Sequence, residues 1–253
     1  MSTEIVKPVV ARTWLDRWDR QQEYFVADRE ERFTVIGDVL AQVVGERPAL
    51  LDLGCGPGSL ASRLAARFPS AAIVAVDTDP LLLALARATT PSTVRLVDAD
   101  LADPDWPRHA GLTAPLDAVV STTALHWLAE PALAALYREI AGLLRPGGVF
   151  VNGDHFTDER PALAALAASV RTERARRRGV TSNENWTQWW AAAETDPDLG
   201  RLVAQRRERG IGGDHGIGVS LQGHLNLLLR AGFRDAGSVW QFGDDHVVVA
   251  VAG

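Results

Sequence analysis

Short apolar runs and longer helical patterns alternate along the first 155 residues of the chain. Five apolar runs have the length of buried strands: residues 50–53, 73–76, 94–97, 117–121 and 149–152. Apolar residues with helical spacing separate most of these runs, at residues 59–68, 79–88 and 131–144. Strands that alternate with helices in this way form a parallel sheet covered by helices on both faces. The pattern therefore predicts a doubly wound α/β domain.

This alternation is absent before and after the core. Two helices are predicted before residue 45, the second with Asp28 as its N-cap, and a later helix begins at Ser182. Near the end of the chain, two strands at 233–242 and 245–251 are joined by a Gly-Asp turn and form an antiparallel hairpin. We therefore predict four parts: a helical N-terminal lid (1–45), a core (46–155), a helical insertion (156–219), and a C-terminal helix and strand hairpin (220–253).

Composition narrows the class of protein. The 253 residues carry a formal net charge of −6, which disfavours a protein that grips nucleic-acid phosphates. Cys55 is the one cysteine, so an intramolecular disulfide and a cysteine-based metal cluster are excluded, and no metal is expected. Because the chain has no secretory-signal pattern and no apolar run of the ~20 residues that a membrane helix needs, we expect a cytoplasmic protein without a membrane partner.

The strongest chemical signal is a glycine loop followed by an acidic residue. The segment 51–59 reads LDLGCGPGS and lies between the first strand and a helix. Glycines at this place let the backbone turn sharply and approach a ligand closely. The next strand ends at Asp77, where a carboxylate can accept hydrogen bonds from both hydroxyls of a ribose. The unit indicates a nucleoside site at the carboxyl edge of the sheet.

The spacing of the loop discriminates between nucleoside ligands. A dinucleotide site has the pattern G-x-G-x-x-G, with a helix N-terminus aimed at a pyrophosphate. Here the pattern is G-x-G-x-G, and Pro57 removes one backbone donor. Asp52 places negative charge where a pyrophosphate would lie, and it suits a cationic amine instead. S-adenosylmethionine has a ribose, an adenine and an amine, and it has no phosphate.

Further short motifs follow the glycine loop along the chain. After LDLGCGPGS and Asp77 come DADL at 98–101, LHW at 125–127, LRPGG at 144–148 and AGF at 231–233. In this order the chain resembles the class I S-adenosylmethionine-dependent methyltransferases, and its LHW segment is similar to the trans-aconitate methyltransferase-like group. The resemblance implies a Rossmann-like, mostly parallel seven-stranded sheet with an antiparallel last strand, and S-adenosylmethionine as cofactor.

The resemblance also implies a set of cofactor-binding residues. Asp77 takes the ribose hydroxyls, Asp100 receives the adenine amine, and Thr122 presents its backbone near the methionine amine. Asp98 competes with Asp100, and we favour Asp100 because an Asp-Leu pair is the usual form. The full set is Asp52, Gly54, Gly56, Gly58, Asp77, Thr78, Asp100, Leu101 and Thr122.

Histidines near the carboxyl ends of the last two parallel strands are the candidate catalytic residues. A base is needed only where the acceptor arrives protonated. His155 is the first choice because it leaves the fifth strand beside Asp154, which could orient it or merely raise its pKa. His126 after the fourth strand is the second choice. His215, in a glycine-rich segment, is a third candidate.

The acceptor side allows more than one interpretation. Trp186, Trp189 and Trp190 in the insertion form either part of a core or an aromatic wall for an acceptor. The basic run 171–178 is either a solvated helix face or a docking patch for an acidic carrier protein or an anionic substrate. We expect methyl transfer to a small molecule, such as a bulky, partly apolar secondary metabolite. Nucleic-acid or protein methylation, and cofactor binding without methyl transfer, stay open, as does the oligomeric state.

Overall fold

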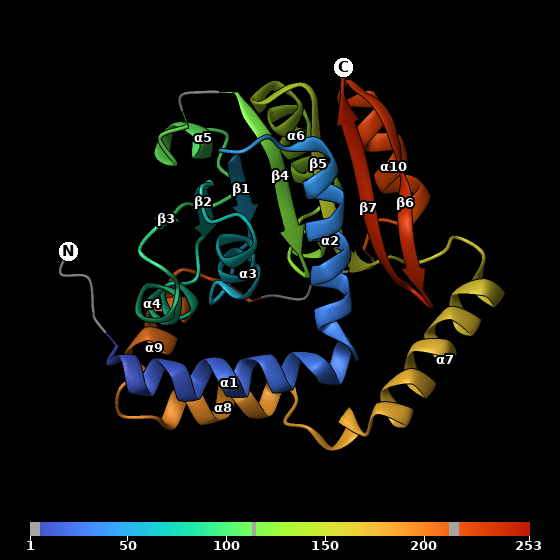
Figure 1. The fold of residues 1–253 in the computed structure, drawn as a ribbon. Helices are drawn as coiled ribbons and strands as arrows, with labels where there is room; N and C mark the ends of the chain where they lie inside the picture. Colours follow the sequence, from blue (N-terminus) through green and yellow to red (C-terminus); the bar gives the residue numbers. More distant parts are fainter. Residues whose placement is uncertain (1–5, 113–114, 213–217) are drawn as a thin grey trace.

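A central sheet of seven strands organises the molecule (Figure 1). The computed structural model describes residues 6–112, 115–212 and 218–253. The strands are β1 (Ala49–Leu53), β2 (Ala72–Asp77), β3 (Val94–Asp98), β4 (Leu116–Thr122), β5 (Leu144–His155), β6 (Phe233–Phe242) and β7 (Asp245–Ala252). Their order is β3-β2-β1-β4-β5-β7-β6. Strands β1 to β5 are parallel to one another, and β7 runs antiparallel to both of its neighbours, β5 and β6. The predicted doubly wound sheet with an antiparallel last strand is confirmed.

Strand β1 lies at the point where the order of the sheet reverses. From β1 the chain proceeds to β2 and β3 on one side, and then returns to β4 on the other side. Leu53, the last residue of β1, is in register with both Val76 of β2 and Ser121 of β4. Doubly wound sheets bind ligands at such a switch point, outside the carboxyl ends of the strands.

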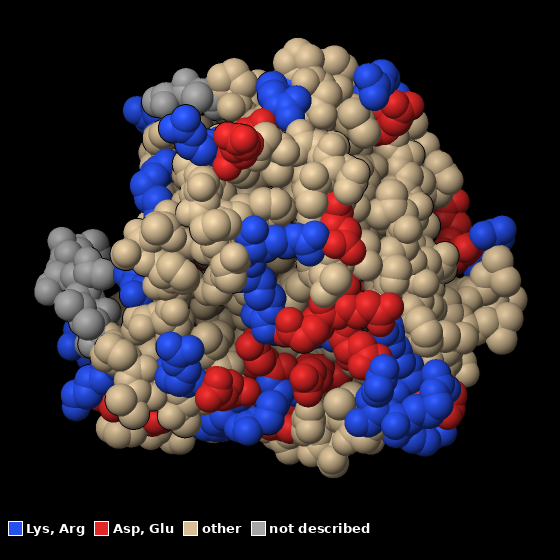
Figure 2. Space-filling view, viewed as in Figure 1, with Lys and Arg blue, Asp and Glu red and all other residues tan. Residues whose placement is uncertain are grey.

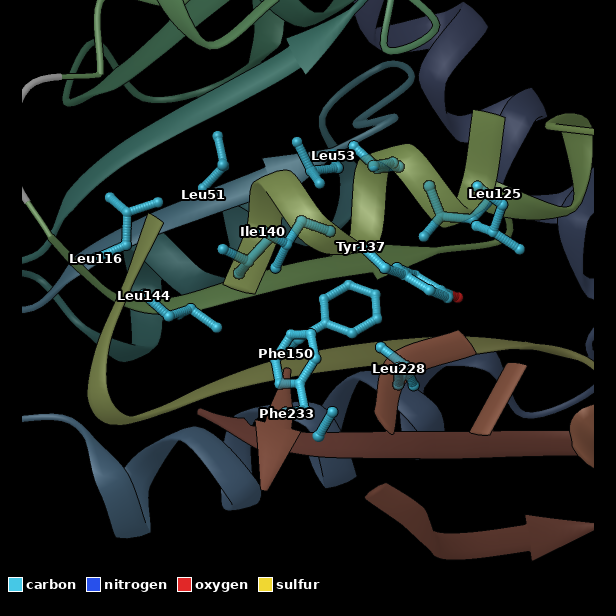
Figure 3. Close-up of a cluster of buried hydrophobic side chains, with 14 of the residues drawn as sticks. Leu51, Leu53, Leu116, Leu125, Tyr137, Ile140, Leu144, Phe150, Leu228 and Phe233 are labelled. Atoms are coloured by element: carbon cyan, nitrogen blue, oxygen red, sulfur yellow. The ribbon is translucent and has the colours of Figure 1, made fainter. Parts of the chain in front are cut away.

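Helices cover both faces of the sheet because successive strand residues point to opposite sides. On one face, α5 (Trp106–His109), α6 (Glu130–Leu143) and α10 (Leu221–Arg230) pack on Leu51, Leu53 and Phe150. Figure 3 shows this cluster, with Tyr137 of α6 beside Phe150. On the other face, α2 (Arg29–Val43) and α3 (Ser59–Arg67) pack on Leu50 and its neighbours. The two cores hold the strand ends in place.

A third apolar cluster joins the N-terminal helix to the insertion. It is built from α1 (Pro8–Phe25), α4 (Pro80–Thr89), α8 (Trp186–Thr195) and α9 (Gly200–Glu208). In Figure 1, α1 and α8 run side by side past the carboxyl edge of the sheet, whereas α7 (Pro161–Arg178) extends away from it. Two short 3₁₀ helices, η1 (Leu125–Trp127) and η2 (Val180–Ser182), complete the elements. Of the helices in the described residues, none has the length and apolarity to cross a membrane.

The helix caps differ in part from the sequence-based expectation. Asp79 caps α4, because its carboxylate accepts hydrogen bonds from the amides of Leu81 and Leu82. Asp28 makes no such bond and has a left-handed backbone, so its predicted capping role is wrong. Ser182 ends η2, and Asn185 caps α8 instead, through a capping box. Arginines of α7 attract the Asp28 carboxylate away from the helix end, which local sequence cannot reveal.

Candidate active site

The glycine loop connects β1 to α3 through backbone conformations that favour glycine. Gly54, Gly56 and Gly58 all have positive φ, at 65°, 53° and 83°. A Cβ atom on Gly54 would lie 2.4 Å from the Cβ of Ala124, so the β4 segment requires glycine there. A Cβ atom on Gly56 would instead meet the nearest atoms, in Leu82 and Trp18, at 3.9 Å. A Cβ atom at Gly56 would thus make only ordinary van der Waals contacts, and its positive φ is the reason that glycine is favoured there.

Asp77 is anchored to this loop. Its carboxylate accepts hydrogen bonds from the amides of Gly56 at 2.7 Å and Asp79 at 2.8 Å. Burial raises the pKa of Asp77 to about 6, although the backbone hydrogen bonds oppose the rise. Each carboxylate oxygen has two lone pairs, so the anchored group can still accept two further hydrogen bonds from a ligand. This is the chemistry that a ribose diol requires.

Asp52 is a buried carboxylate in need of a partner. Its side chain is 1% exposed, and neither oxygen makes a well-formed hydrogen bond to the described residues. Burial raises the pKa of Asp52 to about 8, and the negative charge of Asp77 adds to this rise. A buried carboxyl without a partner is costly, and a cation beside it would offset the cost. The pair of acids therefore fits the ammonium group and ribose of S-adenosylmethionine and disfavours a pyrophosphate.

Asp98 and Asp100, the two candidate residues for binding the adenine amine, have different environments at the end of β3. Both carboxylate oxygens of Asp98 are bound by Arg209, at 2.8 and 2.9 Å. Asp100 is exposed and accepts a hydrogen bond from the Ala102 amide at 2.9 Å. Leu101, the residue after Asp100, and Thr78, the residue after β2, are both half-buried. Asp98 is thus engaged by the insertion, whereas Asp100 faces solvent.

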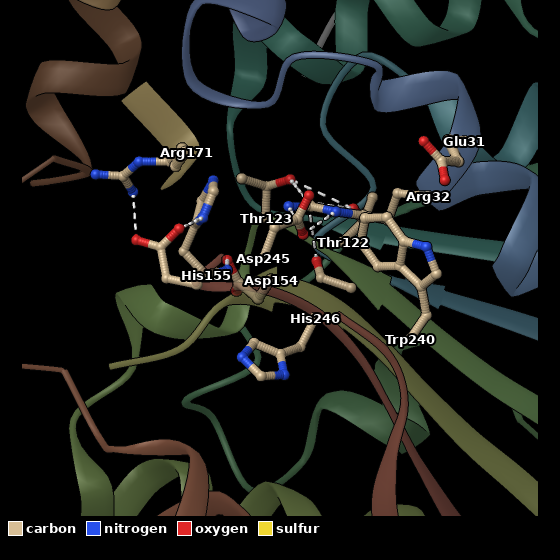
Figure 4. Close-up of polar contacts among 12 residues, drawn as sticks. Glu31, Arg32, Thr122, Thr123, Asp154, His155, Arg171, Trp240, Asp245 and His246 are labelled. Carbon is tan, nitrogen blue, oxygen red and sulfur yellow. Dashed lines mark hydrogen bonds and ion pairs between the residues drawn. The ribbon is translucent and has the colours of Figure 1, made fainter. Parts of the chain in front are cut away.

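A buried arginine ties the ends of β4 and β5 together (Figure 4). Arg32 of α2 donates to Asp245 of β7 at 2.8 Å, and it also reaches the hydroxyls of Thr122 and Thr123 and the carbonyl of Gly153. Its side chain is fully buried. Sequence reasoning missed Arg32 because it follows a run of charged residues that is typical of a solvated helix.

His126 is held by a buried acid. Its Nδ1 lies 2.9 and 3.0 Å from the two carboxylate oxygens of Asp154, whose side chain is 2% exposed. Burial alone would lower the pKa of His126, but the charge and hydrogen bond of Asp154 outweigh it and raise this pKa. Because Nδ1 faces Asp154, the Nε2 atom is the one that can meet a ligand. About 37% of the His126 side chain is exposed.

The expectation that Asp154 orients the ring of His155 is wrong. Neighbouring strand residues point to opposite faces, so Asp154 faces His126 while the His155 ring pairs with Asp244 at 3.2 Å. The Nε2 atom of His155 is buried and has no hydrogen-bond partner among the described residues. The His155 residue lines a cavity of about 10 Å³, which has room for roughly one water molecule.

Tryptophans extend from the lid core to His126. Trp189 is fully buried against Trp14 and Trp18, which is ordinary core packing. Trp186 continues the row at 5.5 Å from Trp18, and Trp127 lies 5.9 Å from Trp186 and 5.3 Å from the His126 ring. Trp127 is 37% exposed. This row of tryptophans is therefore part of the core at Trp189 and an accessible aromatic surface at Trp127.

The basic run of α7 is largely engaged within the molecule. Arg174 and Arg178 bind Asp28, Arg174 also binds Glu31, and Arg171 binds Asp244. Figure 2 shows the result, with acidic and basic side chains intermingled on this face. The third histidine candidate, His215, lies outside the described residues. Within the ranges that are described, no group of three or more His, Cys, Asp or Glu residues is placed to hold a metal ion.

Comparisons with known proteins agree with this site. The profile of a family described as a methyltransferase domain matches residues 50–148. The trans-aconitate 2-methyltransferase of Methylobacterium nodulans is 34% identical over 200 residues, which cover 74% of this chain and 72% of the relative. The enzyme of the same name from Methylobacterium radiotolerans is 40% identical over 122 residues, 47% of this chain and 43% of that relative. The chain thus matches less than half the length of this second relative.

Solved structures show the same fold. Human N-acetylserotonin methyltransferase in complex with S-adenosylmethionine aligns with a TM-score of 0.53 and 18% identity, over 94% of this chain and 56% of that one. An O-methyltransferase family protein from Burkholderia thailandensis aligns with a TM-score of 0.58 and 16% identity, over 97% and 71%.

The doubly wound sheet, the matching family model and these relatives together define an enzyme of the methyl-transferring class. The chain belongs to the class I S-adenosylmethionine-dependent methyltransferase family, and S-adenosylmethionine is its cofactor.

Proposed function

We propose that the protein transfers the methyl group to a carboxylate oxygen of a small organic acid. The observation that carries this proposal is the pair of His126 and Asp154 beside the exposed ring of Trp127. A histidine with a raised pKa can donate a charge-assisted hydrogen bond to an anion, and the neighbouring aromatic surface suits an apolar part of the acceptor. The relatives named trans-aconitate 2-methyltransferase support a small acid as acceptor. A cytoplasmic location is part of the same proposal.

The cofactor placement is also part of this proposal. Asp52 would face the ammonium group and Asp77 the ribose hydroxyls, because the first lacks a partner and the second is anchored with free lone pairs. The remaining residues that line the cofactor would be Gly54, Gly56, Gly58, Thr78, Asp100, Leu101 and Thr122. When bound, the cofactor supplies a methyl group on a sulfonium, which is already a good leaving group.

The residues of the chain then act mainly by orientation. A carboxylate needs no base, so His126 would hold the acceptor through Nε2 while Asp154 fixes the ring. Burial of the acceptor against Trp127 and Trp186 would exclude water from the reacting oxygen. Orientation of this kind can contribute ~7–11 kcal/mol to a reaction barrier. His155, which lines a water-sized cavity and has a buried Nε2 atom, would not contact the acceptor in this arrangement.

The test is a turnover screen with matched acceptors. Purified protein is incubated with S-adenosylmethionine and small di- and tricarboxylic acids, each paired with its amide and its alcohol analogue, and S-adenosylhomocysteine is measured. Turnover with acids and not with their analogues, giving products that mild alkali hydrolyses as esters, supports the proposal. Turnover with alcohols alone, giving alkali-stable ethers, would refute it.

Two further results of the screen would also overturn a small acid as acceptor. Methyl transfer to RNA or protein fractions, with none to the acids, would identify a macromolecular acceptor. Cofactor that binds and is never converted to S-adenosylhomocysteine, whatever acceptor is added, would identify a binding protein that transfers no methyl group.

A further inference from the structure

Two arginines of α9 connect the insertion to the strand ends where the adenosine would lie. Arg206 and Arg209 are three residues apart, so they share one side of the helix end. Arg206 donates to the Asp79 carboxylate at 2.6 Å and stacks on the ring of Trp190 at 4.1 Å. Its side chain is 17% exposed and that of Asp79 is 5% exposed. The helix is therefore fixed to the start of α4 by a mostly buried ion pair.

Arg209 bridges the ends of β2 and β3. It binds both carboxylate oxygens of Asp98, and its Nη1 also donates to the carbonyl of Thr78 at 2.8 Å. Asp98 is the direct register partner of Asp77 in the neighbouring strand. Arg209 therefore holds Asp98, the strand residue paired with Asp77, and the carbonyl of Thr78, the residue that follows Asp77.

The ion pair between Arg206 and Asp79 also connects α9 to Asp77. Asp79, which Arg206 holds, donates its backbone amide to one oxygen of Asp77 at 2.8 Å. Arg206 thus orients Asp77 through Asp79, and Arg209 holds the adjacent strand end. Trp18 of α1 lies close to Gly56. Residues of α1 and the end of α9 thus both lie beside the segment that carries the glycine loop and Asp77.

We propose that α9 is the wall that retains the adenosine half of the cofactor, and that Arg206 and Arg209 are the positioning residues that hold this wall in place. The inference rests on the proposed cofactor placement. Because the pair of Arg209 and Asp98 is partly exposed, at 35% and 38%, it can open and close without unfolding the cores. Its opening lets the cofactor and its product enter and leave, so its strength sets their dissociation rates.

The test measures how fast S-adenosylhomocysteine leaves the full-length protein. Dissociation is followed by stopped-flow tryptophan fluorescence, and affinity by calorimetry. Arg209→Ala is expected to accelerate dissociation about three- to tenfold, since it removes a bidentate ion pair and a bond to a carbonyl. Arg209→Lys restores only part of the retention, because an ammonium group cannot make the bidentate contact.

Arg207→Ala is the matched control. It removes the same charge from the same helix, but Arg207 pairs with Glu194 on the solvent side. Its dissociation rate is expected to equal that of the wild type. Salt separates retention from general destabilisation: added salt should accelerate dissociation from the wild type and should have little effect on Arg209→Ala, which lacks the screened pair.

Asp77→Ala distinguishes the two proposals. If Asp77→Ala weakens binding and Arg209→Ala dissociates at the rate of the Arg207→Ala control, the inference about α9 is wrong while the cofactor placement stands. If Asp77→Ala leaves the affinity unchanged, the cofactor placement is wrong and the inference about α9 is wrong with it.

Discussion

Cofactor binding is expected to release a proton from Asp52. With a pKa of about 8 in the free protein, this carboxyl is roughly 0.9 protonated at pH 7. An ammonium group beside it favours the ionised form, so binding would lower this pKa and expel the proton. The amine of the free cofactor, with an ordinary α-amino pKa near 7.8, would take up about 0.1 proton. The net release at pH 7 is therefore about 0.8 proton per bound cofactor.

The sign of the pH dependence follows from this release. The ionised form of Asp52 binds the protonated amine, so the affinity is greatest near pH 8, where much of the carboxyl is ionised and much of the amine is still protonated. The affinity is lost as the pH falls below the free-state pKa of Asp52 of about 8. Between pH 7 and pH 6 the affinity should fall roughly tenfold, because close to one proton is linked to binding. Asp77, with a pKa raised to about 6, would add to the loss only near and below that pH.

Calorimetry in buffers of different ionisation enthalpy measures the proton directly. At pH 7 the observed binding enthalpy of the wild type should rise with the buffer ionisation enthalpy with a slope of about 0.8 in magnitude. Asp52→Asn keeps the shape of the side chain and cannot ionise. In this variant the release should vanish and a small uptake of about 0.1 proton should remain, so the sign of the slope reverses. A wild-type enthalpy that is the same in every buffer would refute the assignment of Asp52 to the ammonium group.

The remaining predictions concern single side chains. Asp77→Ala should weaken cofactor binding by about 1.5–3 kcal/mol, the contribution of charge-assisted hydrogen bonds, as measured by calorimetry. Asp154→Asn should lower the pKa of His126, because it removes the charge that raises it, and this shift can be followed by NMR titration of the ring. His126→Ala should raise KM for the acid acceptor at neutral pH and leave cofactor affinity nearly unchanged. His155→Ala should keep near-normal turnover at saturating acceptor, because this residue lines a cavity the size of a water molecule.

Each of these predictions has a result that contradicts it. Unchanged affinity in Asp77→Ala, with a normal melting temperature, would remove the ribose assignment. An unshifted His126 titration in Asp154→Asn would mean that the pair is not formed in solution. An unchanged KM in His126→Ala would show that this ring does not hold the acceptor. Loss of turnover in folded His155→Ala would return that histidine to the reaction and would require the cavity beside it to open.

Local patterns were sufficient to predict the sheet and the cofactor loop. The strands and the glycine spacing are encoded in continuous segments, so Asp52 and Asp77 could be assigned to the carboxyl edge from sequence alone. The pairing of Asp154 with His126 could not be predicted from local patterns. It depends on the 3₁₀ turn η1, which places the His126 ring beside the end of β5. Capping failed at Asp28 for a similar reason, since arginines about 150 residues later in the chain compete for its carboxylate.

The insertion shows the same limit. Its helices could be predicted from composition, but an arginine pattern does not reveal which acid it will meet. Arg206 and Arg209 reach acids more than 100 positions earlier in the chain, and these contacts exist only after α9 has packed beside α4. Long-range ion pairs of this kind depend on tertiary structure that a local pattern does not encode.

The position of β7 has a consequence for when the protein can fold during its synthesis. This strand lies between β5 and β6, and its Asp245 neutralises the buried Arg32 that ties the ends of β4 and β5 together. A buried arginine without its counter-ion is strongly destabilising. A nascent chain that has emerged only as far as β5 already carries the glycine loop and both histidines, yet the strand ends that carry His126 and Asp154 cannot settle around Arg32. We therefore expect the ends of β4 and β5 to become ordered only after β7 has been synthesised and has inserted beside β5.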